Sequence, residues 1–265
     1  MASCPIALTI AGSDSSAGAG LQADLKTFQH FGVFGLTAVT CVVAETPHQV
    51  RSIHPVPPAV LQDQILLLLD RYPVAAIKTG MLFSKPHVVA VSEILARYPD
   101  IPLVVDPVMI ASTGDPLLEK DAIAAYRDRL LPRASLITPN LDEASVLCRE
   151  SLQSEEDIER GARMLSETFG TDVLLKGGHL PGTECADFLL AQGSGSWFRS
   201  PRLETAAGHG TGCTLSAAVT AGFAQGMDAA EAVARAKRFL DQTLSEALEF
   251  GQIAMLNQGT TFPKA

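Results

Sequence analysis

The sequence predicts an α/β fold of three layers, in which a doubly wound, mostly parallel sheet carries helices on both faces. Short β-branched runs alternate with longer helical patterns along the chain. Polar or glycine-rich stretches follow several of the predicted strands, at the sheet edge where such folds bind ligands. The 265 residues are 47% hydrophobic, which suits one large core. We therefore expect a single domain over residues 1–265, with a core of about 5–248 and a C-terminal tail at 251–265.

Charge and cysteine usage limit the possible partners. With 20 basic and 29 acidic residues, the formal charge of −9 argues against nucleic acid or an anionic membrane as the main partner. The five cysteines are scattered and form no Cys-x-x-Cys pair, which indicates neither a disulfide framework nor a zinc site. No signal peptide is visible, and the apolar runs are too short to span a bilayer. We expect a cytoplasmic protein.

The expected elements alternate through the first half of the chain. Strands are predicted at about residues 6–11, 35–44, 50–56, 74–78 and 103–105, and helices at about 21–31, from 58 onward, 85–97 and 121–131. The continuous apolar run at 35–44 is typical of a strand covered on both faces. The glycine-rich loop at 12–20 matches neither the dinucleotide fingerprint nor the P-loop, and its glycines suit backbone packing or ligand contact equally.

The second half continues the alternation. Strands are predicted at 135–138 and 173–175, and a β-hairpin at a sheet edge is predicted from 186–190 and 197–198. Ser154 and Asp157 form a capping-box pattern that opens a helix to about 169. Two further helices are expected at about 212–225 and 228–248, and the tail from 251 carries little signal. A polar connection at 112–115 is a candidate mobile flap.

The central stretch is His209-Gly210-Thr211-Gly212-Cys213, directly before an alanine-rich helical run. Glycines let backbone N–H groups turn inward, and a helix start adds unpaired donors and the positive end of its dipole, so this junction suits an anion. We expect the same field to lower the pKa of Cys213, making it a base or nucleophile. The alternative is a plain glycine turn before a buried helix with an inert thiol.

Other polar residues follow predicted strands and should meet at one rim of the sheet. They are Asp106, Asn140, Glu143 and Lys176. Acidic and amide oxygens suit Mg²⁺, the lysine suits phosphate oxygens, and the glycine turn suits a transferring phosphoryl group. Asn140 and Glu143 could instead form only a helix capping box. Glu45 also ends a buried run, where it is either a ligand contact or a solvated loop charge.

Several motifs in one order resemble those of the hydroxymethylpyrimidine and phosphomethylpyrimidine kinases of thiamin biosynthesis, in the ribokinase-like superfamily. The resemblance extends to about residue 248. The motifs are Ala11-Gly12-Ser13-Asp14, residues 18–27, Lys78-Thr79-Gly80-Met81-Leu82, Asp106-Pro107-Val108-Met109, Gly114-Asp115-Pro116-Leu117-Leu118, residues 137–144, Leu175-Lys176-Gly177-Gly178-His179 and residues 209–218.

The resemblance implies an ATP-dependent kinase that uses Mg²⁺, acts on a small pyrimidine and forms a homodimer. It places the anion hole at the backbone of Gly210, Thr211, Gly212 and Cys213, with Cys213 accepting or orienting the substrate hydroxyl proton. It assigns metal contacts to Asp106, Asn140 and Glu143, and ATP contacts to Asn140, Lys176 and Thr211. It places the pyrimidine over Gly12, against Asp24, Glu45 and Met81, with His209 near the transferred group.

One departure from the family pattern concerns substrate choice. The family usually has glutamine where this chain has Glu45. An amide both accepts from the pyrimidine amino group and donates to the adjacent ring nitrogen, whereas a carboxylate only accepts. We therefore expect this chain to act chiefly on the monophosphate, whose phosphate adds binding energy. The alternatives are a pyridoxal kinase of vitamin B6 salvage, because a carboxylate can pair with a pyridinium N–H, and a non-catalytic ligand sensor.

Overall fold

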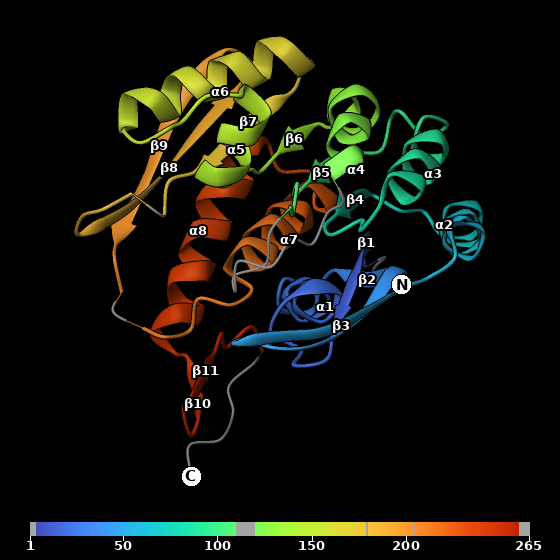
Figure 1. Cartoon of the computed structure of the whole chain (residues 1–265), viewed down its shortest axis with the longest axis horizontal. Helices are drawn as coiled ribbons and strands as arrows, with labels where there is room; N and C mark the ends of the chain where they lie inside the picture. The colour runs from blue at the N-terminus through green and yellow to red at the C-terminus, as the bar shows by residue number, and fades with distance from the viewer. Residues whose placement is uncertain (1–3, 110–119, 179, 204, 260–265) are drawn as a thin grey trace.

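The structure is a computed structural model that describes residues 4–109, 120–178, 180–203 and 205–259. One nine-stranded sheet runs through it in the order β3-β2-β1-β4-β5-β6-β7-β8-β9 (Figure 1). The strands are β1 (Ile6–Asp14), β2 (Phe34–Thr46), β3 (Gln49–Pro55), β4 (Ala76–Thr79), β5 (Leu103–Val105), β6 (Leu136–Ile137), β7 (Asp172–Lys176), β8 (Glu184–Ala191) and β9 (Ser194–Pro201).

The strand pairing confirms the predicted doubly wound sheet. From β2 through β7 each neighbouring pair is parallel, while β3 on one edge and the β8–β9 hairpin on the other are antiparallel. The chain goes from β1 to β2 on one side and later returns to β4 on the other side of β1. The strand order therefore reverses between β1 and β4. In such folds ligands bind at the carboxyl ends of the two strands beside this reversal.

Helices cover both faces of the sheet. They are α1 (Gly20–His30), α2 (Pro58–Arg71), α3 (Lys85–Leu95), α4 (Lys120–Ala125), α5 (Leu141–Cys148), α6 (Glu155–Phe169), α7 (Thr211–Ala224) and α8 (Ala229–Ser245). After α4 the chain makes a π-helical turn at Tyr126–Leu130 and a 3₁₀ turn at Leu131–Arg133, where the sequence suggested one continuous helix.

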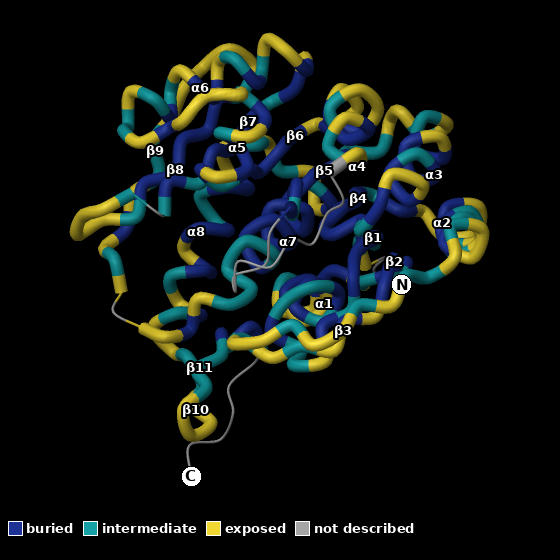
Figure 2. Tube along the Cα trace, in the orientation of Figure 1, coloured by how far each residue is buried: buried dark blue, intermediate teal, exposed yellow. Residues whose placement is uncertain are grey.

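Alternating strand residues assign the helices to two layers. Val105 and Ile137 pack in one core with apolar side chains of α2 to α6, whereas their neighbours Val104 and Leu136 pack with α7 and α8 on the other face. Successive strand side chains point to opposite faces, so an uninterrupted apolar run fills both layers. The tube in Figure 2 is accordingly buried along these central strands and exposed on the outer helices.

Two local predictions differ from the structure. The run at 35–44 is not covered on both faces throughout, because Val42 is 52% exposed where β2 pairs with the edge strand β3. The tail is more structured than its sequence indicates: β10 (Leu248–Phe250) pairs with β11 (Ile253–Met255), and Leu256 is buried with α7 and α8. The proposed flap at 112–115 lies outside the described residues. None of the described helices has the length and apolarity needed to cross a membrane.

Candidate active site

A cavity of about 420 Å³ opens at the carboxyl ends of the central strands. It contains all but one of the residues predicted for the site. The lining residues predicted from the sequence are Gly12, Glu45, Met81, Asp106, Asn140, Glu143, Lys176, His209, Gly210, Thr211, Gly212 and Cys213. Segments that lie far apart in the sequence therefore converge as expected for parallel strand ends.

Asp24 is the exception and lies behind the cavity wall. It is fully buried, accepts a 2.6 Å hydrogen bond from Thr9 Oγ1 and forms a 2.7 Å ion pair with Lys78 Nζ. We expected Asp24 to touch the pyrimidine, but its carboxylate faces Lys78, which lines the cavity in its place. Burial alone would lower the pKa of Lys78, but the Asp24 carboxylate outweighs it and raises that pKa, so the lysine is charged.

Lys78 lines the cavity but was not among the site residues predicted from the sequence. It is a lysine within a four-residue strand in which every residue is buried. A fully buried ammonium group requires a carboxylate partner, so a lysine in an apolar strand was itself the available signal.

A second cavity, of about 260 Å³, adjoins the first. Its outer part is lined by Leu215, Leu240 and Leu244 and by the ion pair between Lys237 and Asp187, whose atoms lie 2.6 Å apart. Four residues line both cavities, namely Asn140, Lys176, Thr211 and Gly212. These four residues form a common wall between two compartments, each of which can hold one ligand.

The start of α7 forms part of this common wall, through Thr211 and Gly212. Gly210 has φ of 83°, and a Cβ at this position would lie 2.0 Å from the Gly18 carbonyl oxygen, so only glycine fits. The first intrahelical bond is donated by Thr214 N to Gly210 O at 2.9 Å. The N–H groups of the preceding helical residues have no acceptor in their own helix, and no acidic residue occupies the first turn. This arrangement suits an incoming anion.

Lys176 and Asp106 form the charged part of the wall. Lys176 Nζ lies 2.9 Å from Asp106 Oδ1, and a Cβ on Gly212 would lie 3.1 Å from the same nitrogen. Ser216 Oγ and Thr138 Oγ1 also donate to Asp106. Burial alone would lower the pKa of Lys176, but Asp106 and Glu143 raise it, so the lysine carries a positive charge beside the helix start.

Cys213 differs from the sequence prediction in its ionisation. Burial, together with the smaller effects of Asp24 and Asp106, raises the pKa of its thiol to about 11, against the opposing effects of Lys78 and a hydrogen bond from the Gly20 backbone. The expectation of a lowered pKa is wrong because desolvation of the thiolate outweighs the field at the helix start. The resting side chain is a neutral thiol.

Asn140 and Glu143 form a capping box and both line the larger cavity, and Asn140 also belongs to the common wall. Asn140 Oδ1 accepts from Glu143 N at 2.9 Å, and Glu143 Oε2 accepts from Asn140 N at 2.8 Å. Burial raises the pKa of Glu143 to about 7, with a further contribution from Asp106. The two interpretations of this motif are therefore compatible, because the cap fixes both side chains at the cavity.

The donor set is compatible with a magnesium ion. Asp106 and Glu143 both line the larger cavity, and each carboxylate keeps lone pairs beyond the hydrogen bonds described. Mg²⁺ is commonly held by one or two carboxylates together with water and substrate phosphates. Removal of the Glu143 proton would accompany such binding, because its pKa lies near neutrality.

Within the described part of the chain, one other cluster has ligand atoms within 4.8 Å of one another: Asp14, Glu45 and His209. Asp14 already accepts hydrogen bonds from the backbones of residues 16, 18 and 19 and contacts His209 Nε2 at 2.9 Å. Burial opposes these contacts, but together they lower the pKa of Asp14 to about 2. This cluster therefore joins the loop after β1 to the loop before α7.

Glu45, the third member of this cluster, is partly buried and lines the larger cavity. Burial, followed by the charge of Asp14, raises the pKa of Glu45 to about 7. Near neutral pH its carboxyl group is present in both protonation states. The protonated form offers one donor and one acceptor, which is also what a glutamine amide offers.

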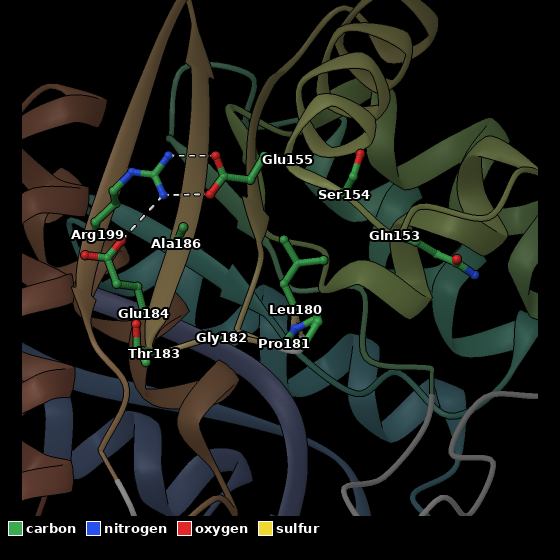
Figure 3. Close-up of a pocket in the computed structure, with 10 residues that line it drawn as sticks. All are labelled: Gln153, Ser154, Glu155, Leu180, Pro181, Gly182, Thr183, Glu184, Ala186 and Arg199. Carbon is green, nitrogen blue, oxygen red and sulfur yellow. Dashed lines mark hydrogen bonds and ion pairs between the residues drawn. The ribbon is translucent and has the colours of Figure 1, made fainter.

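A hollow of about 370 Å³ lies away from the rim, between the start of α6 and the β8–β9 hairpin (Figure 3). Arg199 crosses it, with bonds of 2.6 and 2.8 Å to the Glu155 carboxylate and an ion pair of 3.7 Å to Glu184. Arg199 is therefore paired with both carboxylates. None of its lining residues belongs to the predicted site.

Comparisons with known proteins agree with this geometry. Residues 14–257 match the family described as phosphomethylpyrimidine kinase. A hydroxymethylpyrimidine/phosphomethylpyrimidine kinase of Haemophilus influenzae is 43% identical over 249 residues, which are 92% of this chain and 93% of that protein.

Two solved structures are similar over most of their length. An ADP complex of Bacillus subtilis pyridoxal kinase has a TM-score of 0.90 and 35% identity, and the match covers 97% of this chain and 98% of that one. A phosphomethylpyrimidine kinase of Clostridium difficile has a TM-score of 0.80 and 34% identity, covering 89% and 98%. With a ribokinase-like fold and a family match across nearly its whole length, the chain belongs to the phosphomethylpyrimidine kinase family.

Proposed function

We propose that this chain transfers the γ-phosphoryl group of ATP to 4-amino-5-hydroxymethyl-2-methylpyrimidine phosphate, giving the pyrophosphate used in thiamin biosynthesis. The supporting observation is the common wall between the two cavities. A kinase must bring two ligands together at one anion-stabilising point while keeping water out. Asn140, Lys176, Thr211 and Gly212 meet that requirement.

ATP occupies the smaller cavity in this proposal. The leucines of α7 and α8 cover the adenine base of ATP. The phosphates of ATP extend toward Lys176 and the start of α7. Mg²⁺ would be held by Asp106 and Glu143, with Asn140 beside them, and would neutralise charge on the nucleotide phosphates. The pyrimidine occupies the larger cavity, over Gly12 and against Glu45 and Met81, with His209 beside the transferred group.

The chain's own groups account for the transfer step. Lys176 and the N–H groups at the start of α7 stabilise the negative charge on the moving phosphoryl group. With the monophosphate as acceptor the attacking atom is an oxygen of its phosphate, because the hydroxymethyl oxygen already carries that phosphate; with the free alcohol it is the hydroxyl oxygen. In a loose transition state the attacking oxygen needs orientation more than early deprotonation. The neutral thiol of Cys213 therefore acts by orienting the attacking oxygen, which corresponds to the second of the two roles that the family resemblance implied.

Glu45 selects among acceptors. When protonated it can accept from the pyrimidine amino group and donate to the ring nitrogen, and when ionised it can only accept. The loss of that one donor costs about 1–3 kcal/mol. The monophosphate withstands this loss better than the free alcohol because its phosphate provides additional binding energy, so we propose that it is the preferred substrate.

Pyridoxal is the second candidate acceptor. It is favoured by the similarity to the pyridoxal kinase of Bacillus subtilis and by an ionised Glu45, which can accept from a pyridinium N–H. A non-catalytic sensor is the third candidate and is opposed by the presence of the whole transfer wall. By family resemblance we also propose a homodimer, which light scattering on the purified chain would test.

The decisive experiment measures ADP release with Mg-ATP and three acceptors in parallel: hydroxymethylpyrimidine, its monophosphate and pyridoxal. We expect kcat/KM to be greatest for the monophosphate. A preference for pyridoxal would overturn the proposal in favour of B6 salvage. In Cys213→Ala we expect turnover to fall while ATP still binds, as measured by calorimetry. Absence of turnover by the unmodified chain with all three acceptors would favour the sensor.

A further inference from the structure

The chain returns to the active site after the β10–β11 hairpin. Gln258 is 1% exposed, and its Nε2 donates to Gly18 O and to Thr214 Oγ1, each at 2.9 Å. A carbonyl oxygen cannot donate, so the amide nitrogen must be the atom that faces Gly18. One side chain near the C-terminus thus binds both glycine-rich elements of the site.

The segment that carries Gln258 is firmly packed. Leu256 is 4% exposed and lies in the core formed with α7 and α8, and Asn257 N donates to Thr243 O at 3.3 Å. Met255 also lies against the loop, because a Cβ on Gly18 would be 2.5 Å from its methyl carbon. The position of Gln258 is therefore set by the contacts of its segment with α8, with the core and with the Gly18 loop.

The two acceptors of Gln258 are adjacent to the reacting groups. The Gly18 carbonyl oxygen lies directly against Gly210, because a Cβ added to Gly210 would be 2.0 Å from it. Thr214 directly follows Cys213, and its own N–H makes the first hydrogen bond of α7. Gln258 thereby fixes the distance between the loop after β1 and the helix start that is proposed to receive the phosphoryl group.

Of the Gln258 side chain, only the amide nitrogen takes part in hydrogen bonds with the part of the chain that the structure describes. Among the described residues, its Oε1 has no hydrogen-bond partner although it is buried. A buried acceptor without a partner costs free energy of folding. This cost offsets part of the stabilisation from the two donated hydrogen bonds, whose acceptors belong to two separate elements of the site.

We propose that Gln258 is a positioning residue for phosphoryl transfer, holding the loop around Gly18 and the first turn of α7 at the spacing that the transition state requires. This inference rests on the proposed kinase activity. The contact between Asp14 and His209 joins the same two loops elsewhere, so loss of Gln258 loosens their spacing without separating them.

The test compares Gln258→Met, which keeps the length and removes both donors, with Thr214→Val, which removes one acceptor. Gln242→Met is the matched control, because Gln242 is an exposed glutamine of α8 whose side-chain amide donates to Glu246, away from the site. We expect kcat for the monophosphate to fall about tenfold in Gln258→Met and less in Thr214→Val, with both KM values within twofold of the unmodified chain.

A binding measurement separates positioning from folding. ADP with aluminium fluoride mimics the transferring group, and we expect its affinity for Gln258→Met to fall about tenfold while the affinity for ADP alone is unchanged. Unchanged kcat, or equal loss of affinity for both ligands together with a lower Tm, would overturn the proposal. The binding comparison requires no acceptor turnover, so it still tests Gln258 if the proposed substrate is wrong.

Discussion

Replacement of Glu45 by glutamine tests the recognition of the pyrimidine most directly. The pKa of Glu45 is raised to about 7 by burial and by Asp14. Below pH 7 the carboxyl group is mainly protonated and can donate to the ring nitrogen of the substrate. Above pH 7 it ionises, and the ring nitrogen loses its donor at a cost of about 1–3 kcal/mol.

This cost sets the expected size of the effect. Since 1.36 kcal/mol corresponds to a factor of ten, and about 1% of Glu45 stays protonated at pH 9, the KM for the pyrimidine should rise about 4- to 50-fold between pH 6 and pH 9. Glu45→Gln has no proton to lose, so its KM should stay flat over the same range. The assay is ADP release at saturating ATP, with KM for ATP as the internal control. Equal pH dependence in the two proteins would refute the assignment of Glu45.

Glu45→Gln should also change how the stability of the substrate-free protein depends on pH. The pKa of Glu45 is higher in the folded protein than its ordinary 4.5. The folded state therefore binds more protons between pH 4.5 and 7, and stability from this group is lost as pH rises through that window. Urea midpoints of the unmodified chain should fall relative to Glu45→Gln from pH 4.5 to above 7. Parallel midpoints would contradict the raised pKa.

Four further outcomes are expected. Lys176→Met should lower kcat/KM for ATP at least 100-fold, because it removes the charge at the common wall. Steady-state kinetics would measure this, and a smaller fall would contradict the role of Lys176. Gly210→Ala should destabilise the fold by more than about 2 kcal/mol, because φ is 83° and Gly18 O blocks the Cβ, and an unchanged Tm would exclude this clash. The low pKa of Asp14, about 2, should contribute about 2 kcal/mol that is lost as pH falls from 3.8 through 2, and Asp14→Asn should lack that loss in urea unfolding. Cys213 should react with iodoacetamide at pH 7 more slowly than exposed Cys4, as peptide mapping would show; equal rates would contradict its raised pKa.

Periodicity and strand-end logic predicted the sheet and most of the site. Parallel strands must end at one edge, so residues as distant as Gly12 and Lys176 could be placed together from sequence order alone. Local capping chemistry likewise predicted both capping boxes, because a cap depends only on residues three positions apart.

The errors concern properties that depend on distant neighbours. The ionisation of Cys213 is decided by burial and by Asp24 and Asp106, none of which the local helix start reveals. The position of Asp24 depends on a pairing with Lys78 across 54 residues. The role of Gln258 depends on a contact 240 residues away and on a tail with no periodic pattern. Sequence patterns report local geometry well, whereas desolvation and long-range pairing require the folded chain.

The common wall also separates chemistry from specificity. The groups proposed to stabilise phosphoryl transfer belong to the four shared residues and to α7, whereas Glu45 and Met81 line only the larger cavity, proposed for the acceptor. On this proposal a new acceptor can be accommodated by changes at the ends of β2 and β4 that leave the smaller cavity intact. Such a division lets one scaffold exchange one vitamin precursor for another during evolution while retaining its transfer machinery.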